Sequence, residues 1–145
     1  MKIIQVKKSS SEVRIAVEKF TRQLIEDNSF VLSEAYFQEL LDSESSYLFL
    51  LLDEQDIAGM LTVGIYKSPT GSKAWIEDVV VDANYQGQGL GRMIVQHAID
   101  FVKTEGVESL MLTSNPTRVA ANKLYQSIGF EQKVTNVYRM EFLKS

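Results

Sequence analysis

The feature that most constrains the fold is a run of apolar residues that passes directly into a glycine-rich turn and then into a helix. The apolar run ends at residue 81, Gly87, Gly89 and Gly91 follow at alternate positions, and helical spacing of apolar residues begins at about Gly91. Such a turn lets successive backbone N–H groups point inward at the start of the helix, and its glycines lack the Cβ atoms that would hold a ligand away. The unpaired donors and the helix dipole favour an anion, in practice a phosphate or a pyrophosphate.

Two phosphate-binding motifs do not match this turn. The P-loop needs Gly-Lys-Ser/Thr, whereas Gly91 is followed by Arg92 and Met93. The dinucleotide-binding fingerprint needs G-x-G-x-x-G, whereas the three glycines here give G-x-G-x-G. A lone glycine-rich turn is also compatible with a helix start beside a flexible loop, so its meaning depends on the rest of the chain.

The order of predicted elements indicates one mixed α/β domain over residues 1–145. Ser9 and Glu12 form a capping box that opens the first helix, and Ser33 is the expected N-cap of the second. Two further helices are predicted over about residues 91–105 and 118–128. Predicted strands cover about residues 3–6, 47–52, 57–66, 74–81, 110–113, 130–134 and 137–142. No repeat or linker divides the chain, so we expect one sheet with helices on its faces.

Charge and composition argue against several function classes. The chain has 19 acidic and 15 basic side chains and a net charge of -4, so we expect no nucleic-acid partner. It has no cysteine and one histidine, so we expect no metal site. His97 falls near the apolar stripe of its helix and is predicted to be partly buried rather than catalytic. The longest apolar run, residues 47–52, is too short to cross a bilayer, and the N-terminus lacks the apolar core of a signal peptide, so we expect a cytoplasmic protein with no membrane partner.

A second motif gives the glycine-rich turn a specific meaning. Gln86, Gly89 and Gly91 form Q-x-x-G-x-G after a V-V-V-D strand end, and residues 121–130 read A-x-x-L-Y-x-x-x-G-F. Together the two segments resemble the GNAT superfamily of N-acetyltransferases, in which the first motif is the acetyl-CoA pyrophosphate loop. The resemblance implies an α/β fold with a GNAT-like mixed, mostly antiparallel central sheet of about seven strands flanked by about four helices. It also implies acetyl-CoA as cosubstrate and a small-molecule or peptide amine as acceptor, and it is compatible with a homodimer.

The resemblance further implies which residues hold the cosubstrate. In that fold the strand that ends at residue 81 separates from the next strand, and the pantetheine amides pair with the main chain left free there. A free N–H at this place can also stabilise a developing oxyanion. The residues expected to bind acetyl-CoA are Val79, Val80, Val81, Gln86, Gly87, Gln88, Gly89, Leu90, Gly91, Arg92, Arg118 and Asn122. The three valines are equally well explained as core residues, and Arg118 is expected either to touch a CoA phosphate or to cap acidic neighbours.

Two residues are expected to carry the acid–base chemistry of amine attack on a thioester. Tyr125 matches the tyrosine of the family motif, and a phenol with a pKa of about 10 stays protonated at neutral pH and can donate to the departing sulfur. The alternative is an aromatic side chain that packs beside Leu124 and Ile128 and has its hydroxyl satisfied by the backbone. Glu77 is the expected base, because some family members carry a glutamate at a similar point, and a role in ion pairing at the strand end is equally open. Adjacent strand residues face opposite sides, so only one of Glu77 and Asp78 is expected in the cleft.

Two positions depart from the family pattern. Thr113 stands where a glutamate is often found, and Arg118 stands where an asparagine is often found, which argues against protein N-terminal acetylation that relies on that glutamate. The expected reaction is direct transfer of acetyl to a primary amine without a covalent enzyme intermediate. The alternative is an acyl-CoA-binding sensor or interaction module without turnover. Carboxylates of Glu77, Asp78 and Glu34 near the cleft would favour a cationic acceptor.

Overall fold

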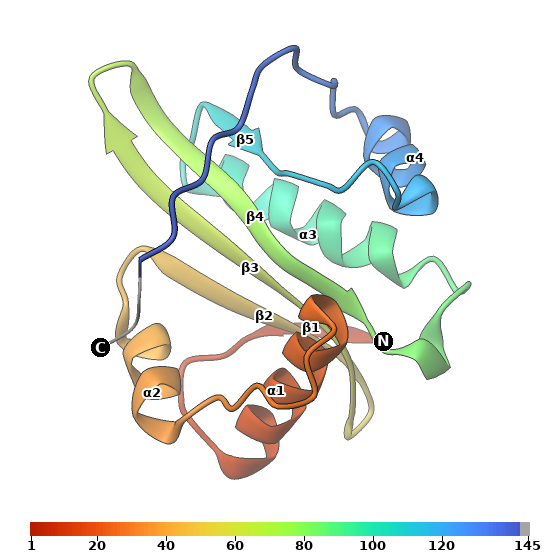
Figure 1. Ribbon diagram of the computed structural model, residues 1–145. Coiled ribbons are helices and arrows are strands. Elements are labelled where there is room, and N and C mark those ends of the chain that lie inside the picture. The colour runs from red at the N-terminus through yellow and green to blue at the C-terminus, as the bar shows by residue number, and fades with distance from the viewer. Residues whose placement is uncertain (143–145) are drawn as a thin grey trace.

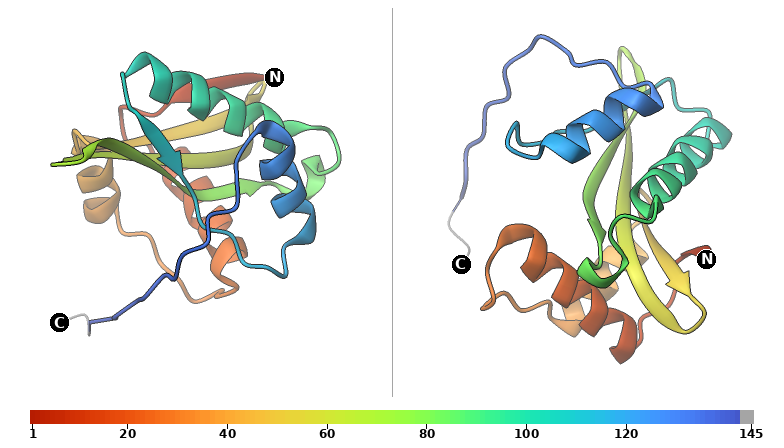
Figure 2. Two further views of the ribbon diagram at one scale, coloured as in Figure 1. Left: turned by 90° about the horizontal axis from the view of Figure 1, so that it is seen from above. Right: turned by 90° about the vertical axis from the view of Figure 1, so that its right-hand side faces the viewer.

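The computed structural model describes residues 1–142 and shows a twisted sheet between two layers of helices (Figures 1 and 2). In chain order the elements are β1 (Lys2–Gln5), α1 (Ser11–Ile25), α2 (Glu34–Asp42), β2 (Ser46–Asp53), β3 (Asp56–Ser68), β4 (Gly71–Val81), a 3-10 turn (Ala83–Tyr85), α3 (Leu90–Thr104), β5 (Ser109–Met111) and α4 (Val119–Ile128). Among these residues no helix has the length and apolar character needed to span a membrane.

The sheet is mixed and mostly antiparallel, as predicted. Its strands lie in the order β1-β2-β3-β4-β5, and each neighbouring pair from β1 to β4 is antiparallel. β5 runs parallel to β4 and pairs only with residues 73–75 of that strand. Beyond Trp75, β4 therefore continues without β5 as a neighbour.

Alternation along the central strands builds one core on each face of the sheet. In β2, Phe49 and Leu51 point into the core on the α3 side, whereas Leu48 and Leu50 point into the core beneath α1 and α2. The two layers are visible on opposite sides of the sheet in Figure 2. α4 packs against α3, where a Cβ at Gly91 would lie 3.3 Å from the Leu124 side chain.

Serine hydroxyls begin the first two helices. Ser33 caps α2, accepting a hydrogen bond from the Tyr36 N–H at 3.1 Å, which confirms the predicted N-cap. For α1 the predicted cap was one residue early, because Ser10 rather than Ser9 has the extended backbone of an N-cap and accepts from the Val13 N–H at 3.2 Å.

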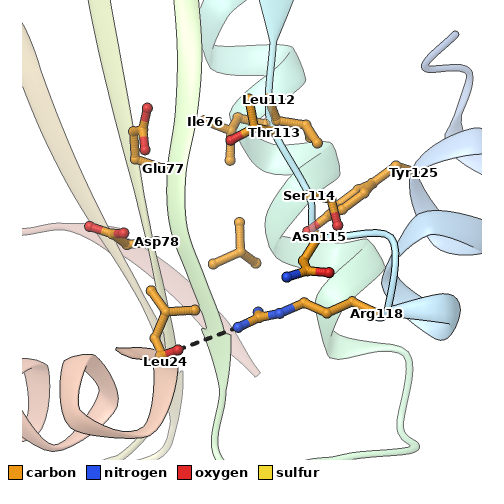
Figure 3. A pocket seen from close by; sticks show the side chains of 11 residues that line it. Leu24, Ile76, Glu77, Asp78, Leu112, Thr113, Ser114, Asn115, Arg118 and Tyr125 are labelled. Atoms are coloured by element: carbon orange, nitrogen blue, oxygen red, sulfur yellow. Dashed lines mark hydrogen bonds between the residues drawn. The ribbon is translucent and has the colours of Figure 1, made fainter. Parts of the chain in front are cut away.

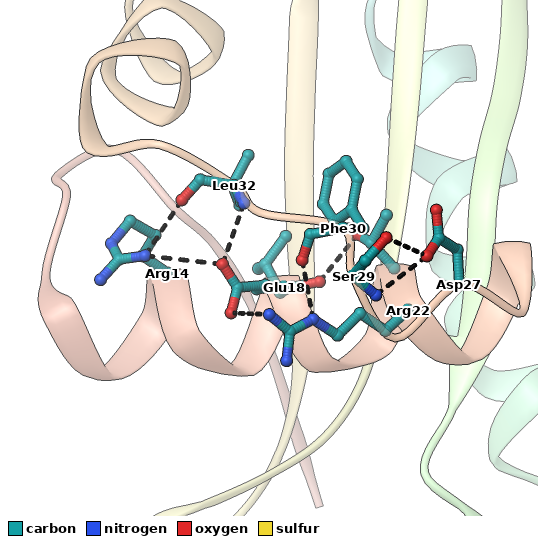
Figure 4. Close-up of polar contacts among 9 residues, drawn as sticks. Arg14, Glu18, Arg22, Asp27, Ser29, Phe30 and Leu32 are labelled. Carbon is teal, nitrogen blue, oxygen red and sulfur yellow. Dashed lines mark hydrogen bonds and ion pairs between the residues drawn. The ribbon is translucent and has the colours of Figure 1, made fainter.

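The connection from α1 to α2 is fastened to α1 by charged side chains (Figure 4). Glu18 accepts from the Leu32 N–H at 2.9 Å, and Arg22 donates to the Phe30 carbonyl at 2.7 Å. Arg14 donates to the Leu32 carbonyl at 3.0 Å, and Glu18 also pairs with Arg22 at 3.1 Å. These bonds fix the loop that follows the last turn of α1, the turn that carries Leu24.

A β-bulge in β4 bends the strand just where β5 leaves it. Met60 of β3 pairs with Val80 and Thr62 pairs with Glu77, so two residues of β4 oppose a single residue of β3. Asp78, inside the bulge, has a left-handed backbone with φ 54°. The bulge increases the local twist and helps β4 diverge from the chain that follows β5.

The sheet has five strands among residues 1–142 rather than the predicted seven or so. The predicted strands at 130–134 and 137–142 are not formed, and the fifth strand is limited to Ser109–Met111. Alternating apolar residues in the last segment have the pattern of a strand, but a strand needs a partner for its backbone groups and here the segment runs alone.

Candidate active site

A cleft opens where β4 and β5 separate, and it gathers residues from four parts of the chain (Figure 3). One wall is β4 at its bulge, and the other is the segment that follows β5. α4 and the end of α1 close the two remaining sides. The lining residues are Leu24, Ile76, Glu77, Asp78, Val79, Leu112, Thr113, Ser114, Asn115, Arg118 and Tyr125.

Tyr125 is the half-buried aromatic residue of this cleft. Its ring lies edge-on to Phe130, with 6.2 Å between the ring centroids, and so is held by packing. Within residues 1–142 no hydrogen bond occupies its hydroxyl, which contrasts with the alternative of a phenol satisfied by backbone. Burial raises the pKa of the Tyr125 phenol, and the Arg118 charge opposes this shift in part. The hydroxyl is therefore a proton donor at neutral pH.

Glu77 and Asp78 both line the cleft, so the expectation that only one of them faces it was wrong. Simple alternation fails at the bulge, because the left-handed backbone of Asp78 turns its side chain to the same side of β4 as Glu77 (Figure 3). Partial burial raises the pKa of both carboxyls, and the neighbouring Asp78 charge raises the pKa of Glu77 further. Two carboxyls with raised pKa values thus stand side by side on one wall.

The glycine-rich turn presents free backbone donors at the start of α3. Gly89, with φ 76°, is the N-cap, and it provides no side-chain cap. The first helical hydrogen bond runs from the Met93 N–H to the Gly89 carbonyl at 3.2 Å. The N–H groups of residues 90–92 come before this bond and have no partner within the helix. A Cβ at Gly87 or at Gly89 would meet open space, which leaves the backbone accessible. This end of α3 suits an anion.

The side chains around the turn have distinct surroundings. Leu90 is only 8% exposed and packs in the core, so its main chain alone is available to a ligand. Arg92 hydrogen-bonds the Ser127 hydroxyl on α4. Gln86, Gly87 and Gln88 are all exposed, whereas Val80, at 3% exposed, belongs to the core beneath α1. Val79 and Val81 are half-buried against the opposite core.

Arg118 and Asn122 lie at the start of α4 rather than on the glycine-rich turn, and of the two only Arg118 lines the cleft. Arg118 reaches across to the last turn of α1 and donates to the Leu24 carbonyl at 3.4 Å. Asn122 donates to the carbonyls of Asn115 and Arg118, at 3.0 and 2.8 Å. Asn122 thus holds the loop before α4, and Arg118 bridges the cleft between α4 and α1.

Two other predicted residues lie elsewhere. His97 packs edge-on against Phe49, with ring centroids 5.0 Å apart, and does not line the cleft. Glu34 lies beside Ser9–Ser11 and Arg14 in a separate hollow, so the expectation that it stands near the cleft was wrong. Among residues 1–142 no three His, Asp or Glu side chains are close enough together to hold a metal ion.

Sequence reasoning missed Leu24, Leu112, Ser114 and Asn115 as cleft residues, and it named Thr113 only as a departure from the family pattern. Leu24 belongs to the apolar stripe of α1, and its spacing resembles that of any core residue. The Asn115-Pro116 dipeptide after β5 was the available signal for a loop at this wall, because such a pair favours turns.

Several known proteins of similar sequence are acetyltransferases. The ribosomal protein bS18 alanine N-acetyltransferase of Salmonella typhimurium is 40% identical over 60 residues, 41% of this chain and 40% of that protein. The mycothiol acetyltransferase of Renibacterium salmoninarum is 36% identical over 90 residues, 60% of this chain and 27% of that protein. These matches span less than half the length of either relative.

A solved structure shares the whole fold. An aminoglycoside acetyltransferase from an uncultured soil metagenomic sample, in complex with trehalose, superposes with a TM-score of 0.87 at 24% identity, covering 99% of this chain and 96% of that one. A sequence profile of the Acetyltransferase (GNAT) family matches residues 15–130, a span that includes the glycine-rich turn, the bulge of β4 and α4. The chain therefore belongs to the acetyltransferase (GNAT) family.

Proposed function

We propose that the protein transfers an acetyl group from acetyl-CoA to a primary amine by direct attack of the amine on the thioester. The observation that carries this proposal is the cleft between β4 and β5, which has a half-buried phenol on one side and two carboxyls on the other. Family membership supports the reaction class.

The described residues fit acetyl-CoA in two places. The free N–H groups at the start of α3 suit its pyrophosphate, because Gly87 and Gly89 leave open space in front of the backbone. The main chain of β4 after Trp75 has lost β5 as a neighbour and offers its polar groups to the amides of an extended arm. When bound, acetyl-CoA supplies an activated carbonyl with a thiolate leaving group.

Tyr125 is the proposed acid. The new bond joins the amine nitrogen to the acetyl carbon while the bond from carbon to sulfur breaks, so the sulfur needs a proton. The Tyr125 hydroxyl has its proton at neutral pH, because burial raises the phenol pKa from its usual value. Arg118, on the same wall, adds a positive charge near the developing thiolate.

Glu77, assisted by Asp78, is the proposed base. An amine must lose a proton as it attacks, and a carboxylate accepts it better when its pKa lies closer to neutral. Burial and the Asp78 charge raise the Glu77 pKa in this direction. The amine proton can pass to a carboxylate directly or through one intervening water, because both carboxyls line the cleft.

The acceptor that fits this wall is a primary amine that is cationic in solution. Two adjacent carboxyls attract an ammonium group to the mouth of the cleft before it is deprotonated. Acceptors of the relatives include a ribosomal protein alanine, as the name of the Salmonella typhimurium enzyme states. We propose a small molecule or a peptide with such an amine.

The substitution Tyr125→Phe tests the assignment. It removes the hydroxyl and keeps the ring that packs on Phe130. We expect kcat to fall about 10²–10⁴-fold, the usual contribution of a general acid, with unchanged affinity for acetyl-CoA. Tyr36→Phe is the matched control, because Tyr36 is exposed on α2 away from the cleft and should keep full activity.

Two outcomes would contradict the proposal. If calorimetry detects no binding of acetyl-CoA, the glycine-rich turn has another role. If the protein binds acetyl-CoA but acetylates nothing in a broad panel of amines, the alternative of an acyl-CoA sensor or interaction module is favoured instead.

A further inference from the structure

Arg118 lies across the cleft and has no acidic partner there. It is the N-cap residue of α4, and its guanidinium extends to the last turn of α1, where it donates to the Leu24 carbonyl at 3.4 Å (Figure 3). Among residues 1–142 it forms no ion pair with a carboxylate. Within the same part of the chain it is also the one basic residue that lines the cleft.

The bond to Leu24 leaves most of the guanidinium available. At 3.4 Å it is longer than an ordinary hydrogen bond, and it uses one N–H of a side chain that carries several in a rigid fork. That fork matches the two oxygens of a carboxylate. Arg118 is an exposed residue, so an anionic group that enters the cleft can reach the remaining donors.

The cleft therefore has two poles of opposite charge. Glu77 and Asp78 form the negative pole on β4, and Arg118 forms the positive pole between α4 and α1. The Arg118 charge opposes the rise in the pKa of Tyr125, whereas burial raises the pKa of both carboxyls. The poles form no ion pair with each other in the described chain, so both remain for a ligand.

The anionic group that suits Arg118 has to come from the acceptor. In the proposed function the pyrophosphate of acetyl-CoA has a separate place, at the free N–H groups before α3. Arg118 lies at the start of α4 and lines the cleft instead. The pantetheine arm and the acetyl group, which the cleft would receive, carry no charge.

We propose that the acceptor is an amino acid, whose ammonium group faces Glu77 and Asp78 and whose carboxylate is bound by Arg118. This inference rests on the proposed acetyl transfer and names its substrate class. A carboxylate suits a cleft with two acidic side chains better than a phosphate does, because a phosphate carries more negative charge. Diamino acids, in addition, keep the net positive charge that the two carboxyls attract.

Matched acceptors test this contact on the natural chain. Each amino acid of a panel that includes lysine, ornithine and alanine is compared with its amide, in which a neutral group of similar shape replaces the carboxylate. We expect kcat/KM for at least one amino acid to exceed that for its amide about tenfold or more, mainly through KM, because a charged hydrogen bond contributes on this scale. This comparison does not require any variant to fold.

Substitutions of Arg118 assign the preference to this residue. Arg118→Gln should abolish it, whereas Arg118→Lys, which keeps the charge without the fork, should retain part of it. The preference is a ratio of two rates on one variant, so effects of the substitution on stability or on the leaving thiolate cancel. Comparing each ratio with that of the natural chain also cancels the difference in basicity between the two amines. Lys123→Gln is the matched control, because Lys123 is exposed on the same helix and does not line the cleft.

Calorimetry gives a readout without turnover. We expect the preferred amino acid to bind the CoA-saturated protein and Arg118→Gln to weaken this binding about tenfold or more, with little change in CoA affinity. Equal use of amino acids and their amides, or a preference that persists in Arg118→Gln, would overturn the inference and leave the proposed function intact. A loss of CoA affinity with an unchanged preference would overturn it too, and would assign Arg118 to CoA. If no amine at all is acetylated, the proposed function itself fails.

Discussion

Two unusual features, one of the backbone and one of the side chain, coincide at Asp78 in the β4 bulge. Its backbone is left-handed, with φ 54°, and partial burial raises the pKa of its carboxyl. A raised pKa in the folded state means that the unfolded chain ionises more easily, so the folded state becomes relatively less stable as pH rises through the ordinary pKa toward the raised one. At pH values above the raised pKa, the folded state keeps the full loss of stability that comes from ionising this carboxyl.

Asp78→Asn should therefore stabilise the protein at neutral pH. Asparagine tolerates the left-handed backbone and has no charge to bury, so the backbone geometry of the bulge is kept. We expect the free energy of unfolding at pH 7 to rise relative to the natural chain and the gain to shrink as pH falls toward 4. Denaturant unfolding at several pH values measures this difference. A gain that is independent of pH would contradict it.

Asp27→Asn provides a control of opposite sign. Hydrogen bonds from the Ser29 hydroxyl and N–H, at 2.6 and 2.9 Å, lower the pKa of Asp27. A lowered pKa gives stability that is present above the ordinary pKa and lost as pH falls through the lowered one. The substitution should thus reduce the free energy of unfolding at pH 7, where Asp78→Asn increases it.

Single residues were predictable where the signal is local. The cap at Ser33 follows from a serine before a helical pattern, and Tyr125 lines the cleft within a motif that the sequence displays openly. The orientation of Asp78 was not predictable, because it depends on the pairing of β4 with β3. The bulge arises from the register of two strands, and neither strand encodes that register alone.

At the scale of elements, the turn before α3 gives a prediction with an internal control. Gly89 and Gly106 flank α3, have φ values of 76° and 73°, and both have open space around a Cβ. Alanine at either position strains a left-handed backbone by about 1–2 kcal/mol. Gly89→Ala should also weaken acetyl-CoA binding at least tenfold, because it disturbs the N–H groups of the turn, whereas Gly106→Ala should not.

Calorimetric titration of the two glycine variants decides between a binding turn and a merely flexible one. Equal loss of stability with unequal loss of affinity supports the binding turn. Equal affinities would show that the turn before α3 serves only to start the helix.

Elements with strong periodicity were predicted well, whereas the last two predicted strands, at residues 130–134 and 137–142, are not formed. α3 begins within one residue of the predicted start at Gly91, and α4 ends at Ile128 as predicted. Residues 130–142 have the composition of strands, yet a strand exists only with a partner, and none of residues 1–142 pairs with them. A pattern specifies what a segment is able to form, and its neighbours determine whether it forms.

At the scale of the whole molecule, the cleft depends on contacts between distant parts of the chain. Arg118 of α4 bonds the carbonyl of Leu24, which is 94 residues earlier, and both line the cleft with Tyr125. The two sequence motifs marked the glycine-rich turn and α4. They did not mark the side of the cleft formed by the end of α1, because α1 reaches the cleft only through the packing of the complete fold.

The charge of the whole molecule gives the last prediction. The chain has a net charge of -4, and the wall formed by Glu77 and Asp78 adds local negative potential at the cleft. A cationic amine should be attracted over a distance of about 10 Å at 0.1 M salt, so kcat/KM for the amine should fall as ionic strength rises. Replacing both carboxyls, Glu77→Gln with Asp78→Asn, should lower the rate and flatten this dependence. Glu39→Gln should leave it steep, because Glu39 is an exposed residue of α2 that does not line the cleft. Initial rates from 0.05 to 0.5 M salt measure the slope. A slope unchanged by loss of both carboxyls would mean that the acceptor approaches by another wall of the cleft.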